Sequence, residues 1–368
     1  MMKRAVWSLV VGFLLVLTLS SCGAAPTSNE EKGPTIALTE GHGYAVKEDG
    51  SLWTWQYAGN HGANMPEPAK VMEGVQSVNA GFNTVFAIDK GNVLWGWGSN
   101  FWGQLGDGIT DVATSTPLKI MEDVRQVSAS GNHTLALKTD GSLWAWGRYD
   151  GGVFGDGRQG EGRSNSPEKI LDGGVRFVEA GPGLSLIIKD DDSLWVSGSN
   201  DRIGLGDGTL ETHDTFFKIM DDVEMASTGG WHVMVVKKDG SLWAWGENRS
   251  GSLGDGTTDA RLSPVKIMDD VTSVSAGQLH SAAIKKDGSL WSWGANENGQ
   301  LGSGSTAASP IPGQVMENVV CVETGYGFCT LALTADGRLW YSGYDGGLDD
   351  VTISDTVMQS IMDGVMIP

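Results

Sequence analysis

The sequence predicts an all-β fold, and three observations support that prediction. Glycine is unusually frequent, at 54 of 368 residues, as in chains that turn often. The apolar runs are short and bounded by glycine, so they suit strands better than helices. A tryptophan-containing segment also recurs along the chain at a nearly constant spacing, which is the signature of a repeat architecture.

The recurring segment reads Asp-Gly-Ser-Leu-Trp-Ala-Trp-Gly at residues 140–147 and again, unchanged, at residues 239–246. Degenerate copies stand elsewhere along the chain. The first tryptophans of the copies are Trp53, Trp95, Trp144, Trp195, Trp243, Trp291 and Trp340. Seven units of roughly 48 residues therefore cover almost everything beyond residue 34.

Each unit contains four segments in a fixed order, as the sixth shows. Residues 271–277 predict a first strand, residues 280–288 a second, and residues 289–294 a third. The Asp-Gly pair between the second and third predicts a hairpin turn. A glycine-rich turn and a proline-containing run, residues 263–270 in the preceding unit, complete the set and predict a fourth strand. Four short antiparallel strands per unit form a propeller blade, so residues 35–368 predict one seven-bladed β-propeller domain.

Both ends of this domain match parts of one unit. Residues 360–365 resemble the start of a repeat, and residues 35–46 resemble the segment that comes after that start. We therefore expect the N- and C-terminal segments to share one blade, which closes the ring and removes exposed sheet edges.

The repeated tryptophans are expected to be structural. Blades stack face to face, so both faces of a third strand are buried: Leu143 and Ala145 on one, Trp144 and Trp146 on the other. Each indole N–H then needs a nearby carbonyl as its hydrogen-bond partner.

The N-terminus predicts export. Met1–Arg4 is basic, and Ala5–Leu19 is an apolar run of signal-peptide length, too short to span a membrane comfortably. The sequence Leu-Ser-Ser-Cys at residues 19–22 resembles a bacterial lipoprotein lipobox, which implies lipidation of Cys22; an ordinary signal peptide with an incidental cysteine is the alternative. We expect a signal peptide over residues 1–21, a flexible tether over residues 22–34, and an extracytoplasmic protein held to a bacterial membrane by lipid.

The repeats resemble the regulator of chromosome condensation family. The shared features are a Gly-x-x-His turn (Gly277, His280), the Asp-Gly hairpin, the Trp-x-Trp-Gly strand, and Asn-x-x-Gly-Gln-Leu-Gly at residues 296–302. The resemblance implies a seven-bladed propeller over residues 35 to 368. Guanine-nucleotide exchange by the nuclear members depends on a long insertion; the tryptophan spacings leave no room for one, so exchange is the function we least expect.

The sequence contains no motif of a catalytic centre, so we expect neither an enzyme nor a cofactor. The histidines His42, His133, His232 and His280 share one repeat position with Leu184, so we interpret them as structural, bonded to the backbone of an adjacent blade. The aspartates of the Gly-Asp-Gly turns are interpreted as acceptors of their own turns' amides rather than as calcium ligands. These aspartates are Asp107, Asp156, Asp207 and Asp255.

Charge and cysteine content limit the partners. A net charge of −20 argues against nucleic-acid binding, which relies on lysine and arginine. Cys321 and Cys329 are eight residues apart with Gly325 and Gly327 between them, so a hairpin turning there could place them opposite each other and permit a disulfide; we favour two separate thiols at strand positions.

The two faces of the predicted propeller differ. One carries the Lys-Asp-Gly and Met-Asp-Asp turns and is acidic. The other carries aromatic residues that the strand motif does not explain: Trp102, Trp231, Phe82, Phe101, Tyr149, Tyr326 and Tyr344. Aromatics on rigid loops suit a binding surface, although packing against neighbouring blades is the alternative. We expect a monomer that binds an unknown extracytoplasmic protein, such as a cell-wall enzyme, through this rim. The alternative partner is an envelope glycan, which the protein would either bind or cleave as a polysaccharide lyase.

Overall fold

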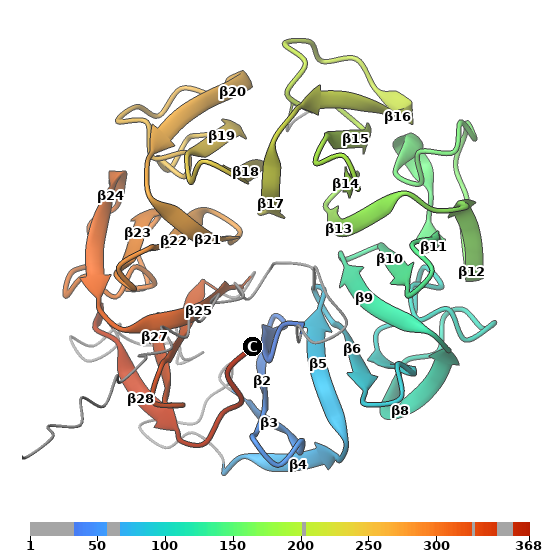
Figure 1. Ribbon diagram of the computed structural model, residues 1–368, viewed down its shortest axis with the longest axis horizontal. Coiled ribbons are helices and arrows are strands. Elements are labelled where there is room, and N and C mark those ends of the chain that lie inside the picture. The colour runs from blue at the N-terminus through green and yellow to red at the C-terminus, as the bar shows by residue number, and fades with distance from the viewer. Residues whose placement is uncertain (1–32, 57–66, 201–203, 326–327, 344–355) are drawn as a thin grey trace, which may run out of the picture.

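Seven four-stranded antiparallel sheets surround a central axis in the computed structural model (Figure 1). The structure describes residues 33–56, 67–200, 204–325, 328–343 and 356–368. Within each sheet the strands pair in sequence order, from an inner first strand to an outer fourth strand. The predicted seven-bladed β-propeller is therefore confirmed, and we number its blades 1 to 7 from the N-terminus.

Each blade contributes one strand to each of four positions, counted outward from the central axis. The first strands are β1 (Ile36–Leu38), β5 (Val75–Ala80), β9 (Val124–Ala129), β13 (Val175–Gly181), β17 (Val223–Thr228), β21 (Val271–Ala276) and β25 (Val319–Thr324). The second strands are β2 (His42–Val46), β6 (Thr84–Asp89), β10 (His133–Lys138), β14 (Leu184–Lys189), β18 (His232–Lys237), β22 (His280–Lys285) and β26 (Cys329–Thr334). The third strands are β3 (Leu52–Gln56), β7 (Leu94–Gly98), β11 (Leu143–Arg148), β15 (Leu194–Gly198), β19 (Leu242–Gly246), β23 (Leu290–Gly294) and β27 (Leu339–Gly343). The fourth strands are β4 (Ala69–Met72), β8 (Thr114–Met121), β12 (Arg163–Leu171), β16 (His213–Met220), β20 (Arg261–Met268), β24 (Ser309–Met316) and β28 (Gln359–Met362). One 3₁₀ turn, η1 (Asp150–Gly152), lies between β11 and β12.

The repeated Asp-Gly-Ser-Leu-Trp segment is a hydrogen-bonded hairpin. Gly141 has a φ of 80°, which favours glycine over any residue with a side chain. The Asp140 carboxylate accepts the backbone N–H of Ser142 (2.9 Å) and its hydroxyl (2.6 Å). The same hydroxyl accepts the indole N–H of Trp144 at 3.0 Å. The first tryptophan of the motif therefore bonds to a hydroxyl two residues earlier rather than to the predicted carbonyl. The second matches the prediction, because Trp146 donates to the carbonyl of Gln104 in blade 2 at 2.7 Å.

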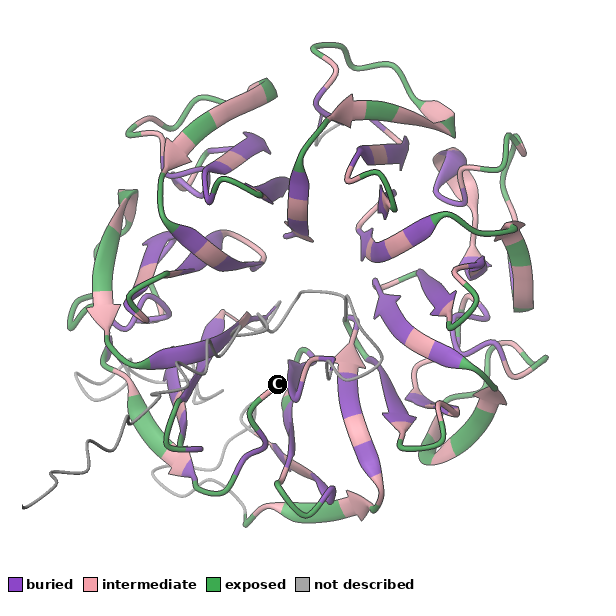
Figure 2. Cartoon of the chain, in the orientation of Figure 1, coloured by how far each residue is buried: buried purple, intermediate pink, exposed green. Residues whose placement is uncertain are grey.

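The core lies between neighbouring blades. Leu143 and Ala145 of β11 pack toward blade 4, in one cluster with Val178 and Ile187. Trp146, on the other face of β11, is fully buried and meets Phe86 of blade 2 edge-on. The first three strands are mostly buried and the fourth strands mostly exposed (Figure 2). Burial on both strand faces, predicted from the lack of polar alternation, is confirmed for Leu143, Ala145 and Trp146, whereas Trp144 is only half-buried.

The two termini share blade 1, as predicted. Val365 pairs with Lys47 in blade 1. In blade 6, Val271 at the start of the first strand pairs with Lys285 in the same way. The N–H of Met366 then donates to the carbonyl of Val46 at 2.8 Å. The first strand of blade 1 is thus completed by residues 365–366 at its start and by β1 at its end; Figure 1 shows the C-terminus next to β2.

The register of β25 and β26 rules out the proposed cross-strand cysteine pair. Thr324 pairs with Thr330, so the hairpin is centred two residues beyond Gly325, and Cys321 lies opposite Leu333. Cys329 is four residues further along the ladder from Leu333, about 13 Å away. That separation exceeds the reach of a disulfide.

The N-terminal predictions fall largely outside the described residues. The signal peptide over residues 1–21, the lipidated Cys22 and the tether as far as residue 32 all lie there. In the part of the chain that the structure describes, no helix has the length and apolar character needed to cross a membrane.

Candidate functional site

Apolar side chains gather on one face of the propeller. We call it the loop face; it is formed by the connections between first and second strands and between third and fourth strands, with the adjoining ends of the fourth strands. The described residues expose ten large hydrophobic side chains, of which only Leu118 and Ile367 lie elsewhere. The loop-face members are Phe82, Phe101, Ile109, Val112, Leu210, Leu262, Ile311 and Val357. A concentration of this kind marks an interaction surface.

The opposite face, which we call the turn face, carries charges that offset each other. Near the ends of five fourth strands a lysine pairs with an acid three residues later, at N–O distances between 2.5 and 3.2 Å. These pairs are Lys70–Glu73, Lys119–Glu122, Lys169–Asp172, Lys218–Asp221 and Lys266–Asp269. The predicted acidic rim is therefore interleaved with lysine, as expected of a solvated surface.

Phe101 and Trp102 are brought together in the β7–β8 loop. Their rings meet edge-on at 4.9 Å. The guanidinium of Arg148 lies 4.5 Å from the Trp102 ring centroid, and Arg163 donates to the Phe101 carbonyl at 2.9 Å. Phe101 is 58% exposed while Trp102 is half-buried beneath its neighbours. Aromatic and arginine side chains are the types that dominate binding energy at protein interfaces.

The other predicted aromatics are spread around the loop face. Tyr149 packs edge-on against Phe154 and beneath Arg158, so the packing alternative applies to it. Trp231 is partly buried against the core cluster between blades 4 and 5. Phe82 is 39% exposed on the β5–β6 loop. Tyr326 and Tyr344 lie outside the described residues.

The buried histidines connect blades through hydroxyl groups. The Nε2 of His133 lies 2.9 Å from the hydroxyl of Ser185 in blade 4. That hydroxyl donates to the carbonyl of Val153 at 2.6 Å, so Nε2 must donate the hydrogen to it. His232 and His280 make equivalent contacts with Ser281 and Thr330. The predicted structural role fits these contacts. The Nε2 partner is a side-chain hydroxyl in each case, and His280 also forms the predicted backbone hydrogen bond, with Cys329 of the adjacent blade.

Burial lowers the pKa of these three histidines. The pKa of His133 and of His280 falls to about 4, and that of His232 to about 3. They are therefore neutral near pH 7. His42 is exposed overall, although partial burial of its ring lowers its pKa as well.

The turn aspartates bond within their own loops. Asp107 accepts the backbone N–H of Ile109 at 3.0 Å, and Asp255 accepts that of Thr257 at 3.0 Å. Asp156 and Asp207 do the same in their turns. This confirms the structural interpretation. Among the residues described, no three His, Cys, Asp or Glu side chains are grouped to hold a metal ion.

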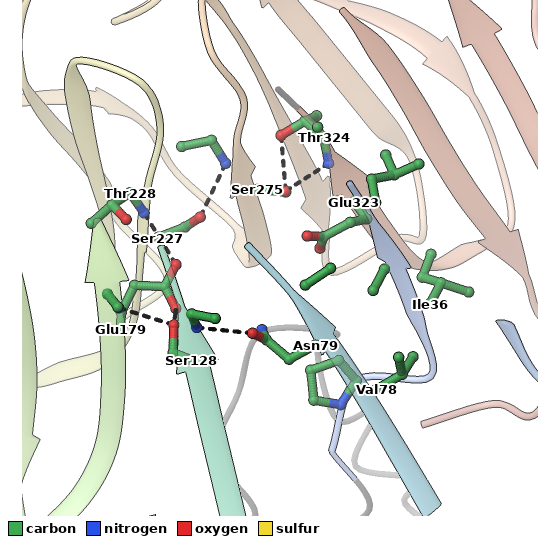
Figure 3. Close-up of a pocket in the computed structure, with 18 of the residues that line it drawn as sticks. Ile36, Val78, Asn79, Ser128, Glu179, Ser227, Thr228, Ser275, Glu323 and Thr324 are labelled. Carbon is green, nitrogen blue, oxygen red and sulfur yellow. Dashed lines mark hydrogen bonds between the residues drawn. The ribbon is translucent and has the colours of Figure 1, made fainter. Parts of the chain in front are cut away.

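A pocket opens along the central axis, in the half of the channel nearer the loop face. It encloses roughly 820 Å³ of space, part of it open to solvent, and the inner strands line it (Figure 3). The fifth residue of each inner strand, in the repeat register, forms a ring around it. These residues are Ala37, Asn79, Ser128, Glu179, Ser227, Ser275 and Glu323.

Most members of this ring bond the next blade. Asn79 accepts the N–H of Ala129 at 3.0 Å, and Ser128 accepts that of Ala180 at 2.9 Å. The carboxylate of Glu179 accepts the N–H of Thr228 at 3.4 Å and the hydroxyl of Ser128 at 3.1 Å. Ser227 and Ser275 continue the pattern toward Ala276 and Thr324. These hydrogen bonds therefore link neighbouring blades around the channel.

Glu179 and Glu323 make this pocket electrostatically unusual. Burial raises the pKa of Glu179 to about 7. Burial, together with repulsion from Glu179, raises the pKa of Glu323 to about 8. The described residues that line the pocket include no lysine, arginine or histidine, so no cation offsets the two carboxyl groups. Buried carboxyls with perturbed pKa values in a cavity are candidates for a functional site.

The sequence interpretation missed these two residues. Glu179 and Glu323 occupy a repeat position held by Asn79, Ser128, Ser227 and Ser275 in other blades. Aligning the first strands of the repeats would have revealed a polar position on an otherwise apolar strand, and the two carboxyls in it.

Comparisons with known proteins agree with this architecture. A model of the regulator of chromosome condensation (RCC1) repeat matches residues 92–137, 239–284 and 287–332, and a second matches residues 124–152 and 271–300. No curated protein matches the sequence significantly.

Solved structures share the fold. Yeast RCC1 (Prp20) bound to Kap60 is 21% identical with a TM-score of 0.67, over 79% of this chain and 78% of that chain. Human WBSCR16 is 22% identical with a TM-score of 0.68, over 81% of this chain and 85% of that chain. The ectodomain of the Physcomitrella patens receptor kinase CR4 is 16% identical with a TM-score of 0.52, over 84% of this chain and 72% of that chain. At such identities the likeness establishes the fold alone.

Proposed function

We propose that this chain, a seven-bladed propeller built from regulator of chromosome condensation (RCC1) repeats, is a protein-interaction module that binds its partner through the loop face. The observation that carries the proposal is the asymmetry of exposure: eight of ten exposed large hydrophobic side chains lie on that face. The turn face, with its paired charges, offers no comparable apolar surface among the residues described.

Phe101 and Trp102 form the aromatic pair of the proposed surface. The loop that carries them is rigid, because Asn100 accepts the N–H of Leu105 at 3.1 Å and donates to the Ile109 carbonyl at 3.1 Å. The N–H of Trp102 is held by the Gln104 side chain at 2.8 Å. A preorganised loop loses little entropy on binding, which favours affinity.

We further propose that the module works outside the cytoplasm. The support is the sequence alone: a basic and then apolar N-terminus, followed by Cys22 in a lipobox-like context and a polar tether. A partner at the same membrane surface, such as a cell-wall enzyme, fits this placement.

A carbohydrate-directed role is the second candidate, and Glu323 favours it. A lyase needs a general base near its sugar-binding aromatics, and a carboxyl with a pKa of about 8 lies in the channel beside the loop face. Binding to an array of envelope glycans would support this role, whereas an absence of glycan binding together with a captured protein would reject it.

Substitution of Phe101 and Trp102 tests the proposed surface. The partner is first identified by cross-linking the native protein in cells, and its affinity is then measured with purified components. Loss of the two aromatics is expected to weaken binding at least about tenfold, since residues of this kind commonly contribute about 2 kcal/mol or more. The variant is Phe101→Ala with Trp102→Ala.

Leu118→Ala provides the matched control. Leu118 is an exposed apolar residue of β8 away from the loop face, and its loss should leave affinity unchanged. If the double variant folds normally and binds as tightly as the control, the loop face is not the binding surface.

A further inference from the structure

Two carboxyl groups share one cavity without a counter-charge. Glu179 projects from β13 and Glu323 from β25, and Figure 3 shows both carboxyl groups turned toward the space enclosed by the inner strands. Glu179 has hydrogen-bond donors in Ser128 and Thr228. Glu323 has no hydrogen bond to any residue that the structure describes. The ionised forms of the two carboxyl groups have no opposite charge in the described lining, so a bound cation would stabilise them.

A second polar group in the wall is also unpartnered. The hydroxyl of Thr228 is buried, with 8% of the residue exposed, and its oxygen bonds to no residue of the described chain. Thr228 lines the same pocket and lies beside Glu179 in Figure 3. The wall therefore holds an unpartnered, buried hydroxyl beside one carboxyl group, and a second carboxyl group without a hydrogen-bond partner in the described chain on another inner strand.

From this geometry we propose that the channel binds a primary ammonium group between Glu179 and Glu323. An ammonium has three hydrogen-bond donors and no acceptor, which matches a site of carboxylate and hydroxyl oxygens without cations. Calcium is a poorer fit, because it needs six or more converging oxygens and these carboxylates come from separate blades. The cavity opens to solvent, so the alkyl chain of a bound ammonium can extend outward from the two carboxyl groups.

The site adjoins the proposed interaction surface. Its lining residues stand at the ends of the inner strands that lead into the loops of the loop face. The ammonium can come from a lysine side chain inserted by a protein partner or from a free polyamine. Binding of an ammonium in the cavity does not depend on whether the loop face binds a protein.

Calorimetric titration with n-butylammonium chloride tests the site. At about pH 9 both carboxyl groups are ionised while the amine keeps its proton. Saturable one-to-one binding is expected, weakening as the pH is lowered through about 7, because Glu179 and Glu323 are the titratable groups in the described lining and both become neutral. Butanol, which has the same shape without the charge, should not bind.

Conservative variants make the test specific. Glu323→Gln keeps the shape of the side chain but removes its charge, and should weaken butylammonium binding by about tenfold or more. Glu297→Gln, on an exposed carboxyl of the β23–β24 loop, should have no effect. No saturable binding by the parent protein, equal binding by Glu323→Gln, or a preference for Ca²⁺ would each overturn the proposal.

Two further ligands separate the sources. Spermidine binding more tightly than a lysine amide with a blocked α-amine would assign the site to free polyamines. The reverse order would assign it to a lysine side chain of a protein. Because no protein partner is present in these titrations, their outcome is independent of the Phe101 and Trp102 experiment.

Discussion

Neutralising Glu179 and Glu323 is expected to stabilise the protein increasingly as the pH rises. The variant carries both Glu179→Gln and Glu323→Gln. From pH 5 to pH 8, its free energy of unfolding should rise by about 4 kcal/mol relative to that of the parent protein. This figure is roughly half the full linkage value for both pKa shifts, because the channel gives water partial access to the two side chains.

The sign follows from proton binding. Both folded pKa values are raised, to about 7 and about 8, above the ordinary value of 4.5. Across this pH window the folded chain binds more of these two protons than the unfolded chain does, so the unfolded state is increasingly favoured as the pH rises. The glutamine variant lacks this penalty.

Urea denaturation at intervals across this window measures the effect. The histidines His133, His232 and His280 act at lower pH, where their depressed pKa values reduce stability as the pH falls below about 6.5. Parent and variant share them, so their contribution cancels in the difference. A difference that does not change with pH would show that the two carboxyls are ionised and well solvated in the folded protein.

Truncating the C-terminal side chains that complete blade 1 is expected to destabilise the whole ring. Val365 is fully buried and Met366 nearly so, and they pack into the two clusters on either side of blade 1. Val365→Ala with Met366→Ala should lower the free energy of unfolding by about 3–5 kcal/mol, through lost burial and the cavities left behind.

Ile367→Ala is the matched control for this closure. Ile367 is 37% exposed, so its truncation should change stability by no more than about 0.5 kcal/mol. Both variants are measured by thermal and urea unfolding. Equal stability of the double variant and the control would mean that blade 1 does not depend on the C-terminal residues.

The fold was predictable because one pattern of strands and turns is repeated seven times. The Asp-Gly turn, the paired tryptophans and the short apolar runs each predict a strand or a turn, and their order predicts the blade. The register at 365–366 was also accessible, because residues 360–365 match a repeat start.

Side-chain partners were harder to predict. The indole of Trp144 bonds to Ser142 because the serine hydroxyl, fixed by Asp140, is the nearest acceptor, a relation that appears only once the hairpin is built. The ring of His133 bonds to the hydroxyl of Ser185 in the next blade, and this contact too appears only once the two blades are packed together. Cys321 and Cys329 lie on strands, as expected, but the sequence did not fix whether they face each other, because that depends on the register in which Thr324 pairs with Thr330.

The channel site escaped prediction because it exists only when seven blades close. Glu179 and Glu323 are 144 residues apart in the chain and share no motif. Their pKa values depend on burial by inner strands from every blade and, for Glu323, on the charge of Glu179. The loop-face aromatics, in contrast, follow from strand alternation once the blade order is known.

The most direct test of the central claim is amide hydrogen exchange of the propeller with and without its captured partner. We expect slower exchange on binding in the loops at residues 81–83 and 99–113, and no change in the turns at residues 139–141 and 238–240. Protection of the turns with unchanged loops would contradict the assignment of binding to the loop face.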